Sequence, residues 1–427
     1  MTEKEATATP WTEALLRDDR SEKRPFQANL ANVVRALKHC PDLQGAIAHD
    51  EFHDCEVSTS ALPWRSAPGR WQETDNLKLA EFLQNHGLNV SVSTANDGVR
   101  ATAFDRSIHP VRDYLTALVW DGTPRLDQVL ATYFGAEDEP YVRVVGRKFM
   151  ISMVARVFQP GCQVDTMLIL EGEQGIGKST GLRELIGNPD WYTGTLPSLD
   201  SRDAYVQLQG KWLLEVAELD AFNRHESNKI KAFITTPVDR YRPLYGKTSQ
   251  DYPRQCVFVG TTNDDQYLRD PSGGRRFWPV SCKSVDRDAL AANRDQLWAE
   301  AVAAFQAGEQ WHLDPTDEAL AQVEQKARFN EDPWANLIDE YVWPNARVTI
   351  EDILITALEV QRKDHDQQKR RRVTDHLKTA GWHRKTSNGK RYWDRPSSIP
   401  SDKQIYVPSD FEQIVGMAAN DQTGVAA

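Results

Sequence analysis

One nine-residue stretch near the middle of the chain has the residue types and spacing of a phosphate-binding loop. Residues 172–180 read GEQGIGKST, which fits the pattern GxxxxGK[ST] at every fixed position. Glycines let backbone N–H groups turn toward a phosphate, a lysine in this place reaches the β- and γ-phosphates, and the next hydroxyl ligates Mg²⁺. The stretch therefore predicts a site for ATP and Mg²⁺, with Lys178 also catalytic and Ser179 a metal ligand. The residues expected to hold the nucleotide are Gly172, Gln174, Gly175, Ile176, Gly177, Lys178, Ser179 and Thr180.

Acidic residues lie at the end of the next apolar run, residues 212–219 (WLLEVAEL). A carboxylate at the end of a buried strand can hold Mg²⁺ through water and orient or deprotonate the attacking water. Glu218 is the first candidate for this catalytic and metal-binding role, and Glu215 is the second. Because side chains of a strand alternate faces, and these two are three positions apart, a regular strand cannot point both into one site. The alternative for either residue is a solvated strand end.

A third apolar run, residues 256–260 (CVFVG), leads through two threonines into Asn263. An amide at a strand tip is placed to hold the attacking water or to sense the γ-phosphate, so Asn263 is expected to be catalytic. An isolated Asn is more often a turn residue. This one ends a buried strand 45 positions after Glu218, which favours the functional interpretation.

Two arginines, Arg275 and Arg276, follow a pair of glycines. Behind such a flexible pair they can reach an anionic phosphate, also across a subunit boundary, as an arginine finger does. Ordinary surface charge is the alternative. Both arginines are therefore further catalytic candidates.

The apolar runs around these motifs alternate with helical segments. Each run is continuous, which is typical of a strand buried on both faces of a parallel sheet. This alternation predicts an α/β P-loop NTPase domain at residues 161–310. The runs lie at residues 166–171, 212–219, 256–260 and 277–280.

Helical periodicity dominates the sequence ahead of this domain. Residues 25–160 are predicted to be a mainly helical region after a flexible tail at residues 1–24, and residues 311–343 to be a helical linker. The helical segments expected in the N-terminal region are 27–40, 76–88, 110–119, 125–134 and 141–158.

Charge is unevenly distributed along the chain. The 427 residues carry a net charge of −11, which on its own argues against a simple nucleic-acid coat protein. Residues 361–395, however, contain twelve Lys or Arg and four Asp or Glu, so this segment carries +8 and the remainder −19. DNA contact depends on where charge lies, so the net charge does not exclude DNA as a partner.

The basic segment has the element order of a winged helix. Helices are predicted at residues 350–360 and 367–380, and a hairpin around the turn signal Ser387-Asn388-Gly389. Such a module lays its second helix in the major groove while the hairpin meets the backbone or minor groove. The alternative is a solvated basic helix beside a core-forming hairpin. The expected DNA contacts are Lys369, Arg370, Arg371, Arg372, Arg384, Lys385, Lys390 and Arg391.

The limits of this winged-helix-like module are placed at residues 344–396, ahead of a polar tail at residues 397–427. Trp382 and Trp393, which flank the hairpin turn, are expected in its core rather than on DNA.

Several classes of protein do not fit the composition. The five cysteines are scattered and never form CxxC, so neither a disulfide framework nor a zinc ribbon is expected. No apolar run approaches the roughly 18 residues of a membrane span, and the first residues lack a secretory signal. A reduced, cytoplasmic protein without a membrane partner is expected.

Three long motifs, in order, resemble the virulence-associated protein E family, a branch of superfamily 3-like helicase ATPases of phages and mobile genetic elements. They are EGEQGIGKST, GKWLLEVAEL and VFVGTTNDDQYLRDPSGGRRFWPV, and the similarity extends over about residues 108–315. The resemblance implies an AAA+-like core, a homo-oligomeric ring that is usually hexameric, and a role in replicating a mobile element in a bacterial host. It also implies that Glu218 is the Walker B acid, Asn263 the sensor and Arg275 or Arg276 the finger.

The resemblance further implies a hairpin that projects into the channel of the ring, between the Walker B and sensor strands. In this interval Arg242, Tyr245 and Lys247 offer cations for the DNA backbone and a ring for base stacking. A surface hairpin with incidental charge is the alternative.

Together these features predict an ATP-hydrolysing DNA helicase or replication initiator that binds single- and double-stranded DNA. No primase site is evident, so a primase, where one is required, is expected to act in trans. Two alternatives stay open: a DNA-binding ATPase switch that does not separate strands, and a P-loop phosphotransferase acting on a small molecule.

Overall fold

The computed structural model describes residues 10–18, 26–195, 203–217, 224–242, 248–264, 267–268, 274–328, 333–387 and 390–397. The chain divides into two units, residues 1–329 and residues 330–427. Within these described ranges, no helix is both long enough and apolar enough to cross a membrane.

A parallel sheet organises the first unit. In the described residues this sheet has five strands, in the order β11-β5-β10-β7-β6, and every neighbouring pair is parallel. The structure is thus mixed α/β, and the predicted apolar runs form four of these strands; the fifth, β6, has no counterpart in the sequence prediction. The bounds are β5 Met167–Glu171, β6 Tyr192–Thr193, β7 Leu213–Val216, β10 Val257–Thr262 and β11 Phe277–Ser281.

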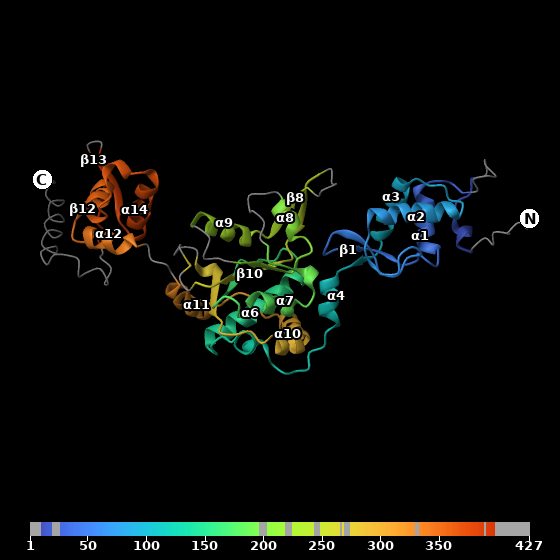
Figure 1. Ribbon diagram of the computed structural model, residues 1–427, viewed down its shortest axis with the longest axis horizontal. Helices are drawn as coiled ribbons and strands as arrows, with labels where there is room; N and C mark the ends of the chain where they lie inside the picture. The colour runs from blue at the N-terminus through green and yellow to red at the C-terminus, as the bar shows by residue number, and fades with distance from the viewer. Residues whose placement is uncertain are drawn as a thin grey trace, which may run out of the picture. The chain divides into compact units, whose positions relative to one another are not determined.

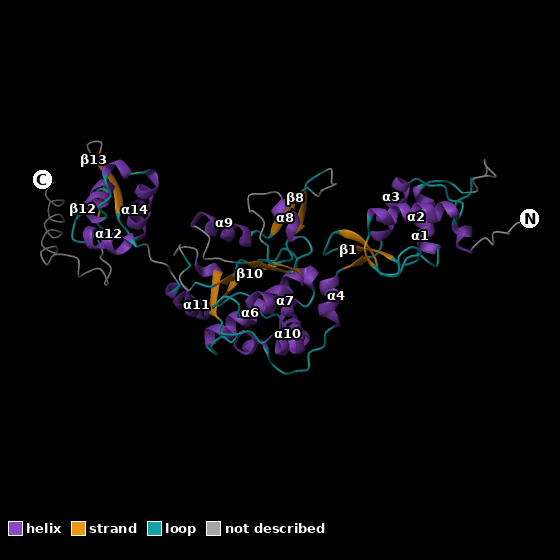
Figure 2. Ribbon diagram, viewed as in Figure 1, coloured by secondary structure: helices purple, strands orange, loops and turns teal. Residues whose placement is uncertain are grey.

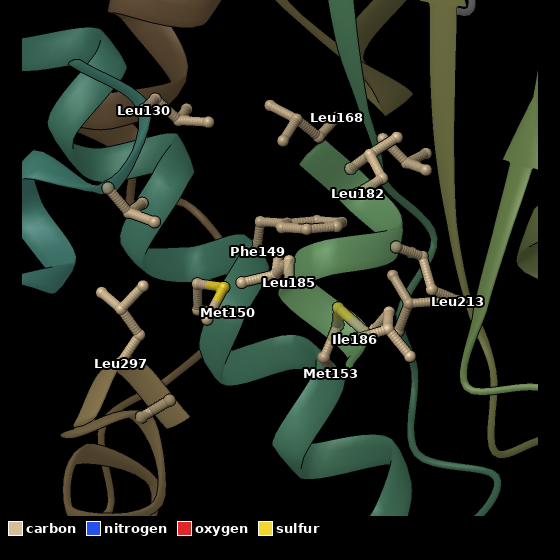
Figure 3. Close-up of a cluster of buried hydrophobic side chains, with 14 of the residues drawn as sticks. Leu130, Phe149, Met150, Met153, Leu168, Leu182, Leu185, Ile186, Leu213 and Leu297 are labelled. Carbon is tan, nitrogen blue, oxygen red and sulfur yellow. The ribbon is translucent and has the colours of Figure 1, made fainter. Parts of the chain in front are cut away.

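Helices cover both faces of this sheet, which explains why β5, β7 and β10 are buried along their whole length. In Figure 1, α6, α7 and α10 lie on one face and α9 on the other. Figure 3 shows Phe149, Met150 and Met153 of α6 packed beside Leu185 and other side chains of α7. The bounds are α6 Pro140–Phe158, α7 Lys178–Ile186, α9 Arg224–Thr235 and α10 Arg287–Gln306.

The predicted boundary at residue 160 therefore falls inside one hydrophobic core, because α6 belongs to the sheet's own packing. Three shorter helices of the first unit also belong to this part. They are α4 Pro110–Ala117, α5 Val129–Phe134 and α8 Asp203–Leu208.

The N-terminal part of this unit contains helices, as expected, but also a small sheet (Figure 2). The flexible tail predicted at residues 1–24 is wrong for residues 10–18, because Trp11 and Leu15 are buried in the hydrophobic core of this part. In the described residues this sheet has four strands in the order β3-β2-β1-β4. The helical segments predicted from the sequence do not include α3. This sheet is not predicted either, because strands of two to four residues are too short to show an alternating pattern. The bounds are α1 Leu30–His39, α2 Glu73–Asn85, α3 Val92–Ala103, β1 Ile47–Asp50, β2 Cys55–Ser58, β3 Gly69–Arg70 and β4 Ser107–Ile108.

A two-stranded hairpin, β8 (Val238–Tyr241) and β9 (Gln250–Pro253), lies between β7 and β10 in the sequence. A buried ion pair holds its base: Arg254 Nε donates to Asp239 Oδ2 at 2.9 Å, and Nη2 donates to the other oxygen. The guanidinium also lies 4.7 Å from the ring centre of Phe233 in α9. This pair joins β8 to the residue that directly follows β9.

Replacing Asp239 with Asn should lower the free energy of unfolding by about 3–5 kcal/mol, because it leaves the buried Arg254 charge without a carboxylate. Asp251→Asn is the control, since it breaks the exposed pair with Arg240 on the same hairpin and should cost at most about 1 kcal/mol. Denaturant unfolding measures both. Equal losses would contradict the assignment of a structural role to the buried pair.

The second unit has its own core and the predicted order of a helix, a basic helix and a hairpin. The first of these helices, predicted at residues 350–360, is shorter: α13 is followed by a π-helical turn, Ile353–Ala357, where the helix ends. Trp382 and Trp393 are both 3% exposed and lie in this core, which confirms their prediction as core residues. In the described residues its strands form a sheet in the order β12-β14-β13. The bounds are α12 Trp334–Val342, β12 Arg347–Val348, α13 Ile350–Asp352, α14 Gln367–Thr379, β13 His383–Ser387 and β14 Lys390–Asp394.

The predicted linker, residues 311–343, is divided between the two units. Its first helix, α11 (Pro315–Ala327), packs on the first unit, where Gln325 Nε2 donates to Phe277 O at 2.9 Å. Its second helix, α12, buries Ile338 in the core of the second unit. Both segments are helical, as expected.

Candidate functional site

The glycine-rich loop joins β5 to α7, so the strand–loop–helix order predicted for it is present. Gly172 has φ of 141°, and a Cβ there would lie 2.3 Å from the carbonyl oxygen of Cys282. Gly177, with φ of 98°, directly precedes the first residue of the helix. Any larger residue at either position would strain the turn, so glycine is required by the backbone path.

An open pocket of about 300 Å³ lies beside this loop. It is found where β5, β7 and β10 end, at the carboxyl edge of the parallel sheet, which is where open α/β sheets bind ligands. Of the predicted nucleotide-binding residues, Gly172 and Ile176 do not line the pocket, and Ile176 packs against the core instead. The lining residues are Gln174, Gly175, Gly177, Lys178, Ser179, Thr180, Ala217, Thr261, Thr262 and Asn263.

Lys178 is buried at the rim of the pocket, and its ammonium group contacts three oxygen atoms. Its Nζ donates to the carbonyls of Gly172 and Glu173, the latter at 3.0 Å, and to Asn263 Oδ1 at 3.3 Å. Burial lowers the pKa of Lys178 from its ordinary value. Since an ammonium has three N–H donors, an incoming phosphate must replace at least one of these partners.

Glu215 lies on β7, which is separated from β5 by β10, and its side chain contacts the first turn of α7. Its carboxylate is almost fully buried, and Ser179 Oγ donates to Oε1 at 2.6 Å. The first candidate for this acidic role, Glu218, lies outside the described residues. The second candidate, Glu215, lies beside the Ser179 hydroxyl.

Two further hydroxyl groups, which the sequence does not single out, contact the same carboxylate. Thr261 Oγ1 donates to Glu215 Oε1 at 2.7 Å, and the Tyr192 hydroxyl donates to Oε2. Thr261 could have been suspected from its place at the tip of the β10 strand. Tyr192 carries no such signal, since only the pairing of β6 with β7 brings it near Glu215.

These side chains fit a nucleotide bound with Mg²⁺. Lys178 and the N–H groups of a positive-φ loop suit phosphate oxygens, and the Ser179 hydroxyl and Glu215 carboxylate are hard oxygen donors. The described residues contain no group of three or more His, Cys, Asp or Glu that could hold a metal by itself. A Mg²⁺ ion in this pocket would thus take its other ligands from phosphates and water, as it commonly does.

Arg275 and Arg276 are not part of this pocket. They immediately precede β11, whose first residue, Phe277, pairs with Met167 at the start of β5, whereas the loop follows the end of β5. Over the length of β5, at about 3.3 Å per residue, this separates the two features by about 13 Å along the strand direction. Within one chain, these arginines therefore lie at the amino ends of the parallel strands, whereas the pocket lies at their carboxyl ends.

The predicted DNA contacts of the second unit differ in what surrounds them. Arg372 lies 4.0 Å from the ring centre of Trp334, and Lys369 Nζ donates to Asp366 at the start of α14. Both are half-buried. The other six candidates in this unit are exposed: Arg370, Arg371, Arg384, Lys385, Lys390 and Arg391.

The candidates on the hairpin of the first unit are only partly described. Arg242 is exposed at the end of β8, whereas Tyr245 and Lys247 lie outside the described residues.

Comparison with known proteins found no match among curated proteins. The structure is similar to two apo structures of the C-terminal region of NrS-1, with TM-scores of 0.44 and 0.46 and 12% sequence identity in both cases. These matches cover 81% and 87% of this chain, and 95% and 100% of the respective NrS-1 chains. Among family models, that of the virulence-associated protein E-like domain matches residues 115–330, just over half of the chain. The resemblance seen in the motifs is thereby confirmed, and the chain belongs to the virulence-associated protein E-like family.

Proposed function

We propose that this protein hydrolyses ATP with Mg²⁺ and uses the reaction on DNA, as a helicase or replication initiator of a phage or mobile genetic element. The observation that carries the proposal is that Lys178, Ser179 and Asn263 line one pocket and that the Glu215 carboxylate, behind it, accepts from Ser179. These residues come from the ends of two strands, β7 and β10, and from the start of α7. An ammonium, a hydroxyl, a carboxylate and an amide at a phosphate-binding loop are the groups that phosphoryl transfer to water requires.

Each group has a distinct task in this proposal. Lys178 exchanges its carbonyl partners for phosphate oxygens and offsets the charge that develops as the γ-phosphoryl group leaves. Asn263, within reach of Lys178, holds the attacking water in line with that group. Glu215 fixes the Ser179 hydroxyl, and the bound Mg²⁺ supplies neutralisation of the phosphate charge. Glu218, two positions beyond the described end of β7, is the second acid and the candidate base.

The basic second unit supports DNA as the partner. Its exposed arginines and lysines occupy the start of α14 and the β13–β14 hairpin, the arrangement of a winged helix that enters a groove and touches phosphates. Membership in a family of phages and mobile elements points the same way. A small-molecule phosphotransferase would not need such a unit. A DNA-binding ATPase switch, which assembles on DNA without separating strands, is the remaining alternative.

Strand displacement on forked DNA distinguishes the two DNA-dependent functions. Forks with a 3′ or a 5′ single-stranded tail are incubated with the protein and ATP, or with a non-hydrolysable analogue. A helicase should separate the forks that carry one of the two tails, and it should do so with ATP but not with the analogue. Forks that stay annealed while DNA still stimulates ATP hydrolysis would support the switch instead.

The placement of Arg275 and Arg276 predicts that they serve the pocket of a neighbouring subunit in a homo-oligomeric ring, expected to be a hexamer. A double variant, Arg275→Ala with Arg276→Ala, is mixed with the Lys178→Ala variant. Some interfaces in the mixed rings then pair an intact pocket with intact arginines, and the restored turnover should match the fraction of such interfaces. Neither parent variant alone should be active, because an arginine finger contributes about 10³-fold or more. A double variant whose activity is unaffected by mixing would argue against action in trans.

A further inference from the structure

A carboxylate with an unusually complete set of hydroxyl donors lies behind the pocket. Among the described residues, the hydroxyls of Ser179, Thr261 and Tyr192 all donate to Glu215. A carboxylate offers about four lone-pair positions, so these bonds leave roughly one for a further partner. Ser179 has its own task at the loop. The other two hydroxyls have none in the proposed reaction.

The register of the sheet explains how these groups meet. Tyr192 pairs with Leu213, which is two residues before Glu215, so both side chains point to the same face. Val259 pairs with Glu215, and Thr261 follows it by two residues on that face as well. Ser179 comes from α7, which covers the same face. Three strands and one helix are thus required to build the cluster.

Tyr192 is itself firmly positioned. Its side chain is buried, and the Arg183 guanidinium lies 5.3 Å from the centre of its ring. The strand β6 lies at the edge of the sheet and is joined to β7 by parallel pairing. The hydroxyl therefore has a fixed location from which to hold one oxygen of the carboxylate.

From this geometry we infer that Tyr192 and Thr261 are positioning residues that fix the plane of the Glu215 carboxylate for Mg²⁺-nucleotide. The inference rests on the proposed function and assigns it two residues. A glutamate has one more rotatable bond than an aspartate, so its carboxylate needs an anchor on each oxygen to hold one orientation. Tyr192 anchors Oε2, and Thr261 anchors Oε1, the oxygen that also accepts from Ser179 of the loop.

The experiment separates metal use from nucleotide binding. A fluorescent non-hydrolysable ATP analogue is bound to the full chain while Mg²⁺ is titrated, and the half-saturating Mg²⁺ concentration is measured. Tyr192→Phe removes only the hydroxyl and should raise this concentration about tenfold, the usual effect of losing a group that orients a metal-associated ligand. Binding of the analogue in the presence of EDTA should stay within about twofold of the wild type.

Thr261 supplies an independent pair of variants, which decides the matter even if Tyr192→Phe folds poorly. Thr261→Val should raise the half-saturating Mg²⁺ concentration, whereas Thr261→Ser keeps the hydroxyl and should not. Tyr114→Phe is the matched control, since it removes a tyrosine–carboxylate bond to Asp295 outside the pocket.

The outcomes are distinct. If the wild-type protein binds the analogue with Mg²⁺ and neither Tyr192→Phe nor Thr261→Val changes the Mg²⁺ requirement, the positioning role is overturned while the proposed function stands. If the wild-type protein does not bind the analogue at all, both are overturned. A raised requirement in both variants, with Tyr114→Phe and Thr261→Ser unchanged, supports the inference.

Discussion

Replacing Lys178 with Ala is expected to reduce ATP hydrolysis by about 10³-fold or more. The ammonium group contacts the first carbonyls of the glycine-rich loop and the Asn263 amide, so it stands where the β- and γ-phosphates would lie. Losing one preorganised donor from such a site commonly costs about 10²–10³-fold in rate, and here a full positive charge is also removed. Steady-state release of phosphate, with and without DNA, measures the effect.

A lysine elsewhere on the same domain provides the control. Lys211 precedes β7, and its Nζ donates to a carbonyl, that of Asp190, outside the pocket. Lys211→Ala should hydrolyse ATP at nearly the wild-type rate. Comparable losses in the two variants, or full turnover by Lys178→Ala, would contradict the assignment of the site.

The strongest sequence predictions concern features with a local cause. The glycine-rich loop follows from short-range backbone requirements, and the structure places it between β5 and α7, where the pattern predicts it. Three of the other strands are also recognisable, because burial on both faces makes each of them continuously apolar. Trp382 and Trp393 can be assigned to a core for a similar reason, since the large apolar rings that flank a hairpin turn are stabilised by burial.

Features that depend on the three-dimensional meeting of distant residues are predicted less well. Glu218, the first candidate acid, lies outside the described residues, whereas the second candidate, Glu215, accepts a hydrogen bond from Ser179. That contact depends on the registers of β7 with β10 and of β10 with β5, which no pattern in one strand encodes. Tyr192 reaches the same carboxylate only through the short edge strand β6. Arg275 and Arg276 lie at the amino ends of the strands because β11 runs parallel to β5, and this too depends on the pairing of two strands.

Neutralising four exposed cations of the second unit is expected to weaken duplex DNA binding by about 10²-fold or more at low salt. The variant combines Arg370→Gln in α14 with Arg384→Gln, Lys390→Gln and Arg391→Gln in the β13–β14 hairpin. All four side chains are exposed, so their replacement leaves the tryptophan core of the unit intact. For each DNA phosphate that the variant no longer neutralises, the slope of log affinity against log salt should become shallower by about 0.9.

The control for this variant uses a basic residue that is engaged within the unit. Arg347 packs 3.9 Å from the ring centre of Tyr392 and bonds to Asp394, so Arg347→Gln should reduce stability while leaving the salt slope nearly unchanged. Fluorescence anisotropy at several salt concentrations measures both variants. If the variant with all four substitutions keeps the wild-type slope, these four exposed cations of the second unit do not bind DNA. Because the salt slope counts released counterions, it separates phosphate binding from a general loss of folding.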